Sequence, residues 1–483
     1  MKELLQERYF YYFEQISRIP RESGNEKAVS DWIFQWAKKL GLRAVQDAAL
    51  NLVIYKQASC GYEACSPVLL QAHMDMVCEK TPDSAHDFAN DPIRLCTDGE
   101  WLMSACDTTL GADNGIGMAC AMAILEDKTL CHPPLEVIFT VEEETTFKGA
   151  NALNPALVLA KRMINLDHAQ EEELIAGSCG GTGAEFKLPL VWETVKKEDC
   201  SVWQIKLEGL LGGHSGEDIH RGRGNAIKLL MRVLQKAVLQ EALVISICGG
   251  TNRLAIPREA SALLACKNGY DIQKAVSTML NELKKELGAA GASMNLQLVR
   301  QSCKEENIQV LNKESFEKVI QAVLLFPDGI FCMSSEFTGQ VTSSDNLGIL
   351  EVFPHTGGLK IVSEIRGLYP SMAEDTADKI RTLAAVCGAE AVFFDGYGSW
   401  EYRPVSPLRE WALLKYRELY KKEMKVSVIH AGLEGAMFSQ KIPGMDIISI
   451  GPDCQFFHSP KERVRIASVR RFYEFLTQLL TIK

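Results

Sequence analysis

The sequence of 483 residues lacks the features of several common protein classes. No apolar run approaches the roughly 18 residues that a membrane-spanning helix needs, and the N-terminal segment carries charges where a signal peptide has an apolar core. There is no basic excess either, since 52 Lys and Arg stand against 62 Asp and Glu, for a net charge of −10. We therefore expect a cytoplasmic protein that binds neither nucleic acid nor membranes.

Paired cysteines are also missing. The chain has 15 cysteines, an odd number, and no two of them form a C-x-x-C pair. A disulfide framework or a cysteine-based structural zinc site would show paired spacing. We interpret the cysteines as small buried hydrophobic residues in a reducing compartment. With 47% hydrophobic and 24% charged residues, the composition is typical of a folded globular chain.

The first part of the chain, to about residue 190, alternates helix and strand patterns. This alternation predicts an α/β fold with a mostly parallel sheet flanked by helices, whose ligands bind beyond the carboxyl ends of the strands. The spacing of Ser23 and Glu26 predicts a capping box. The expected helices cover residues 2–17, 26–40 and 115–125, and the expected strands cover residues 68–72, 135–140 and 163–166.

From about residue 199 the pattern changes to half-solvated strands and amphipathic helices, which indicates a separate α+β domain. A later strand at residues 446–450, which His458 follows, is expected to rejoin the first sheet. We therefore predict a catalytic domain in two parts, residues 1–196 and 397–483, with an inserted lid and dimerisation domain at 197–396. The inserted domain is expected to hold strands at 201–207, 242–248, 260–266 and 293–299 and helices at 225–237 and 271–287; a further helix is expected at 407–420.

Polar residues at the strand ends carry the chemistry. His73 and Asp75 share one face of an extended segment, so the carboxylate is placed to orient the imidazole; an ordinary surface pair would look the same. Asp113 lies in a glycine-rich loop before a buried helix, where it reads either as an N-cap or as a carboxylate free to bridge two cations.

Two further acidic segments follow strands. The residues 142–144 are all Glu and close an apolar strand; they read as a solvated face or as acids beside a cation. Asp167 repeats the pattern, and His458 lies beyond the last strand. Histidine with carboxylate and no clustered thiolate is typical of a catalytic zinc, cobalt or manganese site. A bridging carboxylate would favour two metal ions.

These segments, taken together and in order, resemble the M20 metallopeptidase family, most closely its aminoacyl-histidine dipeptidase branch. The resemblance implies a zinc-exopeptidase type of fold. The matching stretches are residues 73–77, 108–117, 143–144, 165–167, 212–216, 218–226, 249–253, 430–434 and 458–460.

The resemblance implies a role for each matching residue. His73 and Asp167 would bind one Zn²⁺, and Glu144 and His458 a second, with Asp113 bridging and Co²⁺ or Mn²⁺ as substitutes. Asp75 would orient His73, and Glu143 would be the general base that activates a metal-bridged water. The three consecutive glutamates leave a one-place ambiguity, which counting back from Gly149 resolves in favour of Glu143 as base.

Other matching positions point to the substrate. His214, which as a lone histidine in a glycine-rich turn reads more often as structural, would reach the partner subunit's active site in a homodimer and stabilise the oxyanion. Asn252 and Arg366 would hold the substrate's C-terminal carboxylate, and Gly432 would be a further substrate-binding residue. Glu434 is the candidate for recognising its free ammonium group.

The sequence thus predicts a dinuclear zinc dipeptidase for Xaa-His and other short dipeptides. An N-acyl-amino-acid deacylase or a tripeptidase on the same fold is the alternative. From other classes, a cysteine hydrolase using Cys78 or Cys106 lacks an orienting third group, and a metal-binding scaffold without catalysis would have no need of Glu143.

Overall fold

The computed structural model describes residues 1–237, 242–266, 270–303 and 305–483. They divide into two compact units, which are described separately. The first unit comprises Met1–Ser178, Trp400–Val428 and Leu433–Lys483, and the second comprises Cys179–Ser399 and Ile429–Gly432. Residues 179–196, which the sequence analysis placed in the first catalytic segment, belong to the second unit, as do residues 429–432.

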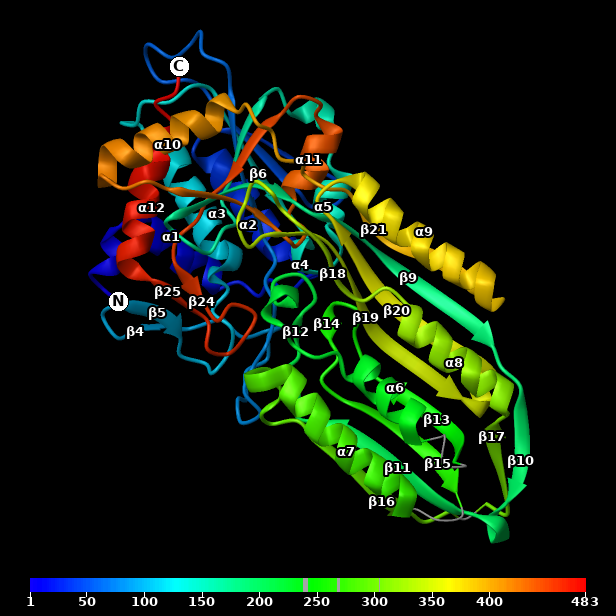
Figure 1. The fold of residues 1–483 in the computed structure, drawn as a ribbon. Coiled ribbons are helices and arrows are strands. Elements are labelled where there is room, and N and C mark those ends of the chain that lie inside the picture. The colour runs from blue at the N-terminus through cyan, green and yellow to red at the C-terminus, as the bar shows by residue number, and fades with distance from the viewer. Residues whose placement is uncertain (238–241, 267–269, 304) are drawn as a thin grey trace. The chain divides into compact units, whose positions relative to one another are not determined.

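The main sheet of the first unit is parallel in its centre, where β6, β3, β7 and β23 lie side by side (Figure 1). Antiparallel strands flank this centre, and the strand order is β1-β2-β6-β3-β7-β23-β8-β22. In that order the strands are Arg43–Gln46, Leu52–Lys56, Leu135–Thr140, Val68–His73, Arg162–Asn165, Asp446–Ser449, Glu173–Ser178 and Lys425–Ile429. Strand β23 therefore lies in the first sheet, as predicted for residues 446–450. Strand β22, also from the C-terminal part of the chain, lies at the end of the same sheet.

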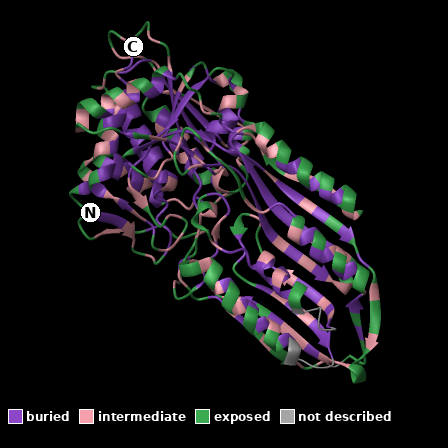
Figure 2. Cartoon of the chain, in the orientation of Figure 1, coloured by how far each residue is buried: buried purple, intermediate pink, exposed green. Residues whose placement is uncertain are grey.

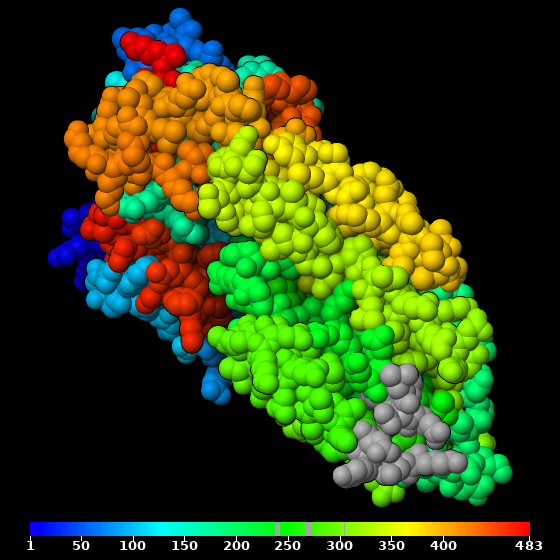
Figure 3. All heavy atoms as spheres, in the orientation of Figure 1, coloured from blue at the N-terminus to red at the C-terminus, as the bar shows by residue number. Residues whose placement is uncertain are grey.

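The central strands are rich in apolar residues because both faces of the sheet are covered. Every residue of β3 and β6 is buried, and Figure 2 shows the sheet as a continuous buried layer. The helices of this unit are α1 (Arg8–Ser17), α2 (Lys27–Lys39), α3 (Ala112–Glu126), α4 (Glu143–Thr146), α5 (Lys148–Ala152), α10 (Pro407–Tyr420), α11 (Gly435–Lys441) and α12 (Ile466–Leu479). Figure 3 shows α10, in orange, on the outer surface of this unit.

Helix packing follows from the apolar patterns. Helix α3 is buried nearly all round because it lies between β3 and the apolar face of α1, which contributes Phe10, Phe13 and Ile16. A smaller antiparallel sheet, of order β24-β25-β5-β4, completes the unit. Its strands are Cys454–Gln455, Arg463–Arg465, Trp101–Ser104 and Leu95–Thr97.

The predicted capping box at the start of α2 is wrong. The Ser23 hydroxyl donates to Asp75 over 2.7 Å instead, and the Glu26 carboxylate accepts the backbone N–H groups of Gly24 and Glu142. Both side chains are used for long-range contacts, which the local spacing cannot reveal. The predicted helix at residues 2–17 is also interrupted, because Glu7 adopts an extended conformation before α1 begins at Arg8.

The second unit is built on an antiparallel sheet of order β16-β11-β15-β13-β19-β20-β9-β21, with β18 also paired to β19. In that order the strands are Asn295–Gln301, Ser201–Glu208, Ala260–Cys266, Leu243–Gly249, Val341–Phe353, Gly358–Gly367, Gly180–Pro189 and Glu390–Tyr397, with β18 at Gly329–Met333. Strand β10 (Trp192–Lys196) pairs with β17 (Asn307–Leu311), and β12 (Gly213–His214) pairs with β14 (Ala255–Ile256).

Amphipathic helices cover this sheet, and their apolar faces share one hydrophobic core with it. The helices are α6 (Ala226–Ala237), α7 (Tyr270–Leu287), α8 (Lys313–Leu325) and α9 (Pro370–Cys387).

The architecture confirms the predicted α/β class, a mostly parallel sheet flanked by helices. Among the described helices, none combines the length and apolar character required to cross a bilayer.

Candidate metal centre

Four of the predicted residues meet because they follow or end strands that are parallel neighbours. His73 ends β3, and its strand neighbours are β6 and β7. The chain continues from β6 into Glu143 and Glu144, and from β7 into Asp167. Carboxyl ends of adjacent parallel strands lie at the same edge of a sheet. The strand register therefore brings one histidine and three acids together, as the sequence predicted.

Asp113 lies between two histidines. Its Oδ1 atom is 3.0 Å from Nε2 of His73, and its Oδ2 atom is 3.4 Å from Nε2 of His458. The histidines come from segments far apart in the sequence, one at the end of β3 and the other in the loop after β24. Each carboxylate oxygen of Asp113 thus faces a different imidazole, which is the arrangement that a bridging ligand requires.

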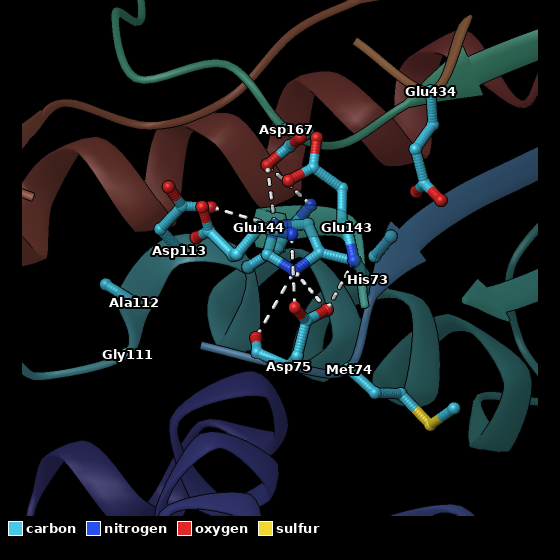
Figure 4. A network of polar contacts seen from close by, with 12 residues as sticks. His73, Met74, Asp75, Gly111, Ala112, Asp113, Glu143, Glu144, Asp167 and Glu434 are labelled. Carbon is cyan, nitrogen blue, oxygen red and sulfur yellow. Dashed lines mark hydrogen bonds and ion pairs between the residues drawn. The ribbon is translucent and has the colours of Figure 1, made fainter. Parts of the chain in front are cut away.

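Each histidine has a second carboxylate beside it. Asp167 Oδ1 is 3.4 Å from Nε2 of His73, and Glu144 Oε2 is 3.1 Å from Nε2 of His458. Two sets of three ligand atoms result, each within 4.8 Å of one another: His73 with Asp113 and Asp167, and His458 with Asp113 and Glu144. Figure 4 shows the acids gathered around the His73 ring.

The electrostatics of the cluster are those of crowded carboxylates. Burial and the charge of Asp113 raise the pKa of Asp167 to about 8, and burial together with Asp167 and Glu144 raises the pKa of Glu143 well above its ordinary value. Although burial disfavours the imidazolium, Asp113 and Glu144 raise the pKa of His458 to about 11. A divalent cation would relieve this repulsion, and an imidazole and carboxylate donor set fits Zn²⁺, Co²⁺ or Mn²⁺.

Asp75 is fully buried behind His73. Its Oδ1 atom lies 3.3 Å from Nδ1 of His73, the ring nitrogen opposite the cluster. The same carboxylate accepts the backbone N–H groups of Glu143 and Glu144, over 3.0 and 3.1 Å. Burial would raise the pKa of Asp75, but His73 and the hydrogen bond from Ser23 lower it overall, so Asp75 remains ionised beside the imidazole.

The N-cap interpretation of Asp113 is wrong. Helix α3 begins at Ala112 with Gly111 before it, no side chain caps it, and Asp113 itself has non-helical backbone angles. A cis peptide bond joins Asp113 to Asn114. The Asn114 amide reaches Asp167 instead, with Nδ2 donating to Oδ1 over 2.8 Å. From this non-helical start of α3, the Asp113 carboxylate faces the two histidines.

Two buried charged residues that the sequence analysis missed hold this loop. The Glu462 carboxylate accepts backbone N–H groups from all four residues of 110–113, over 2.7 to 3.3 Å. From the other side, Arg21 donates to the carbonyls of Met74 and Asp75 and to that of Gly111. A Cβ at Gly111 would lie 2.4 Å from the guanidinium, so glycine is required there.

A weak signal for Glu462 exists, because a carboxylate is favoured at a helix N-terminus, but nothing in the sequence points to α3 as its partner. Arg21 carries no such signal. Both residues bind main-chain atoms, and such contacts cannot be predicted from the spacing of side chains in the sequence.

Glu434 is completely buried at the start of α11. Its Oε2 atom accepts hydrogen bonds from the Gln71 amide and, over 2.6 Å, from the Thr140 hydroxyl. Burial raises the pKa of Glu434 to about 7. Figure 4 shows its side chain beside that of Glu143 rather than inside the ring of acids around His73.

The remaining predicted residues lie in the second unit. Arg366 on β20 donates to the Tyr397 hydroxyl over 2.7 Å and to the Ser215 hydroxyl over 3.1 Å, so the turn that carries His214 is tied to Arg366. The Nδ1 atom of His214 accepts the N–H of Glu217 over 3.1 Å. Close to this turn, a Cβ at Gly216 would lie 2.1 Å from the carbonyl of His430, two residues before Gly432.

Asn252 lies in a turn, where its Oδ1 atom accepts the N–H of Leu254 over 2.9 Å. The next residue, Arg253, pairs with Glu364 over 2.7 Å, two residues before Arg366 on the same strand. The second unit therefore connects His214 with Arg366, and a neighbouring ion pair joins the Asn252 turn to the strand that carries Arg366.

Comparison with known proteins decides the family. The model of Peptidase family M20/M25/M40 matches residues 69–482, the range that contains the whole cluster. The chain belongs to this family. The predicted M20 membership is therefore confirmed, and the chain is a peptidase of this hydrolase family.

Similar proteins cover nearly the whole of this M20 peptidase. The cytosol non-specific dipeptidase of Escherichia coli (strain K12) is 38% identical over 97% of this chain and 96% of the relative. The crystal structure of aminoacylhistidine dipeptidase from Vibrio alginolyticus superimposes with a TM-score of 0.84 at 34% identity, covering 98% of this chain and 96% of that one. Aminopeptidase PepT from Bacillus cereus shares the fold, with a TM-score of 0.55 at 15% identity over 99% of this chain and 98% of that one.

Proposed function

We propose that this chain is a dinuclear zinc dipeptidase that hydrolyses Xaa-His and other short dipeptides in the cytoplasm. The names of the two most similar relatives above support the dipeptidase activity. His73 and Asp167 would hold one metal ion, His458 and Glu144 the other, and Asp113 would bridge them. Zn²⁺ is the proposed ion, with Co²⁺ or Mn²⁺ as substitutes.

One observation carries the proposal of two metal ions. The Asp113 carboxylate directs one oxygen toward His73 and the other toward His458, at 3.0 and 3.4 Å. A single-metal site would need only one of these histidines, and a structural acid–base pair would not need the second carboxylate beside each of them. Bound metal ions would supply Lewis-acid polarisation of the scissile carbonyl and would make water more acidic.

Glu143 is the proposed general base. It is placed on the first turn after β6, and its ligand atom lies within 4.8 Å of those of His73 and Glu144. With bound cations offsetting the neighbouring acids, a carboxylate at this position could take a proton from the attacking water and pass it to the leaving amine. Asp75 fixes the backbone of Glu143 and the ring of His73 at once, so it is a positioning residue for both.

The substrate is proposed to be held at both ends. Glu434 would bind the free ammonium group, and Arg366 with Asn252 would bind the C-terminal carboxylate, for which a guanidinium is suited. Gly432 would be a further substrate-binding residue. His214 would act across a homodimer formed through the inserted domain, as an oxyanion donor in the partner subunit's site. With one group for the ammonium end and another for the carboxylate end, the proposed substrate is a small zwitterionic peptide.

Turnover of a small substrate panel by the zinc-loaded protein tests this proposal. The panel contains alanyl-histidine, β-alanyl-histidine, N-acetyl-histidine and a tripeptide. We expect both dipeptides to be hydrolysed and the other two compounds to be poor substrates. Equal turnover of alanyl-histidine and N-acetyl-histidine would instead identify an N-acyl-amino-acid deacylase, and preference for the tripeptide would identify a tripeptidase.

A further inference from the structure

A chain of buried polar side chains runs through the sheet to Glu434. The Ser449 hydroxyl donates to Oδ1 of Asn165, and Nδ2 of Asn165 donates to Oε1 of Gln71 over 2.6 Å. The Nε2 group of Gln71 then donates to Oε2 of Glu434, and the Thr140 hydroxyl donates to the same oxygen over 2.6 Å. These five residues are called the amide relay below.

The relay crosses the centre of the sheet, since all its residues except Glu434 come from the adjacent strands β23, β7, β3 and β6. None of its side chains is more than 1% exposed. Water therefore cannot satisfy these groups, and each must find its partner inside the protein. Since Nδ2 of Asn165 occupies Oε1 of Gln71, only Nε2 of Gln71 can face Glu434, and the direction of donation along the relay is fixed.

Both relay donors act on the same oxygen of Glu434. The other oxygen, Oε1, is buried and has no hydrogen-bond partner among the residues that the structure describes. A buried carboxylate oxygen without a donor is costly in free energy. The relay thus fixes one oxygen in place and leaves its neighbour without a donor. The Glu434 carboxylate lies near enough to Glu143 for its charge to raise the pKa of Glu143, and Figure 4 shows both side chains.

We propose that Gln71 and Thr140 are positioning residues that hold Oε1 of Glu434 toward the free ammonium group of the substrate and thereby set the requirement for an unacylated N-terminus. This inference rests on the proposed dipeptidase function. An ammonium group carries three N–H donors and a positive charge, so it satisfies the buried oxygen. A compound without the ammonium group would leave this buried oxygen without a donor and would be rejected.

The test compares alanyl-histidine with propionyl-histidine, which has the same shape but no amino group. Variants Gln71→Met and Thr140→Val remove one relay donor each with little change of volume, and Thr140→Ser keeps the hydroxyl. Each zinc-loaded protein is assayed with both compounds, and propionyl-histidine is measured as a competitive inhibitor where its turnover is too slow. Metal content and Tm are recorded for every variant.

Wild-type protein should prefer alanyl-histidine by at least about a hundredfold in kcat/KM. Each donor-less variant should lose about ten- to hundredfold of kcat/KM for alanyl-histidine, mainly through KM, because a hydrogen bond to a charged group is removed. The kcat/KM or inhibition constant for propionyl-histidine should change by less than about twofold. This compound has no ammonium group to contact Glu434, so the relay donors do not affect its binding. Thr140→Ser should recover most of the preference.

The outcomes separate this inference from the function on which it rests. A parallel fall for both compounds, or no change for either, would overturn the role of the relay while leaving the dipeptidase intact. Wild-type protein that cleaves the two compounds equally would overturn the proposed function itself, before any variant is considered.

Discussion

The carboxylate of Asp75 accepts the backbone N–H of Glu143 over 3.0 Å. The same oxygen, Oδ1, lies 3.3 Å from Nδ1 of His73. One buried carboxylate therefore fixes the proposed general base and a proposed metal ligand relative to each other. Asp75 contacts no atom that would react, so its contribution is to geometry.

Replacing Asp75 by asparagine should weaken both metal binding and turnover. An asparagine can present only one oxygen, so it cannot accept from His73, Glu143 and Glu144 together. We expect metal affinity or kcat/KM to fall by about ten- to hundredfold, the usual effect of losing such a partner. Competition with a chelating dye measures the affinity. Ser23→Ala, which removes a single donor to Asp75, is the control and should have a smaller effect; equal effects would contradict the shared role of Asp75.

Glu143→Gln should keep its metal ions and lose most of its turnover, because glutamine cannot take up a proton. General acid–base catalysis contributes about a hundred- to ten-thousandfold, and kcat should fall by that order. Glu142→Gln is the matched control, since the Glu142 side chain pairs with Lys148 at the surface. Metal content by mass spectrometry and kcat for alanyl-histidine show whether Glu143 or Glu142 is the general base. Full turnover by Glu143→Gln with bound metal would refute the mechanism.

The site residues on strand ends could be predicted because two simple rules apply to them. A parallel strand that is buried on both faces reads as an apolar run, and the polar residue after it falls at the edge where ligands bind. His73, Asp167 and Glu144 all follow this rule. The predicted helix at 407–420 matches the bounds of α10, which Ser406 caps by accepting the N–H of Arg409 over 3.1 Å.

Residues that act through main-chain atoms or across the sheet could not be predicted. Glu462 binds four backbone N–H groups of a loop some 350 residues earlier in the chain, and no spacing relates the two segments. Gln71 and Asn165 read as interruptions of apolar strands, yet they hydrogen-bond to each other over 2.6 Å. Ser23 has the spacing of a cap but contacts Asp75, because a tertiary partner displaced the local one.

Removing metal should abolish activity, and Zn²⁺, Co²⁺ or Mn²⁺ should restore it. Metal ions that bind only the folded state also stabilise it, so the Tm should fall on chelation. A cysteine hydrolase would behave differently, because it would resist chelators and lose activity on thiol alkylation. The structure disfavours Cys78 as a nucleophile, since burial raises the pKa of its thiol to about 12 and the reactive species is the thiolate. Chelator-resistant activity that alkylation destroys would revive that alternative.

Glu173, which pairs with His168 and Lys425, should make stability depend on pH. Burial would raise its pKa, but His168, Lys425 and Ser427 together lower it to about 2. A carboxyl group with a depressed folded-state pKa contributes stability above its unfolded value near 4.5, and this contribution is lost as pH falls toward 2. The contribution at neutral pH is at most about 3 kcal/mol.

Glu173→Gln should therefore lower the free energy of unfolding at pH 7, and its difference from wild type should shrink as the pH is reduced from about 4.5 to 2. Urea unfolding at several pH values measures this. The neighbouring Glu172→Gln is the control, because Glu172 and its partner Lys422 are both well exposed and such pairs contribute little. A difference that stays constant across this pH range would contradict the assignment.

The proposed role of His214 across the dimer predicts complementation between two inactive proteins. His214→Ala should lose the oxyanion donor, which costs about a hundred- to thousandfold in kcat, whereas Glu143→Gln loses the base. In a heterodimer, the site that carries the intact Glu143 would receive His214 from the other chain, so one of its two sites would be complete. Mixing the two variants under conditions that exchange subunits should restore activity, up to about half of the wild-type value per heterodimer, because only one site in two is whole. Differently tagged chains allow the heterodimer to be purified and its activity compared with each parent. Verified heterodimers that show no recovery would mean that His214 acts within its own chain or only supports the turn around Ser215.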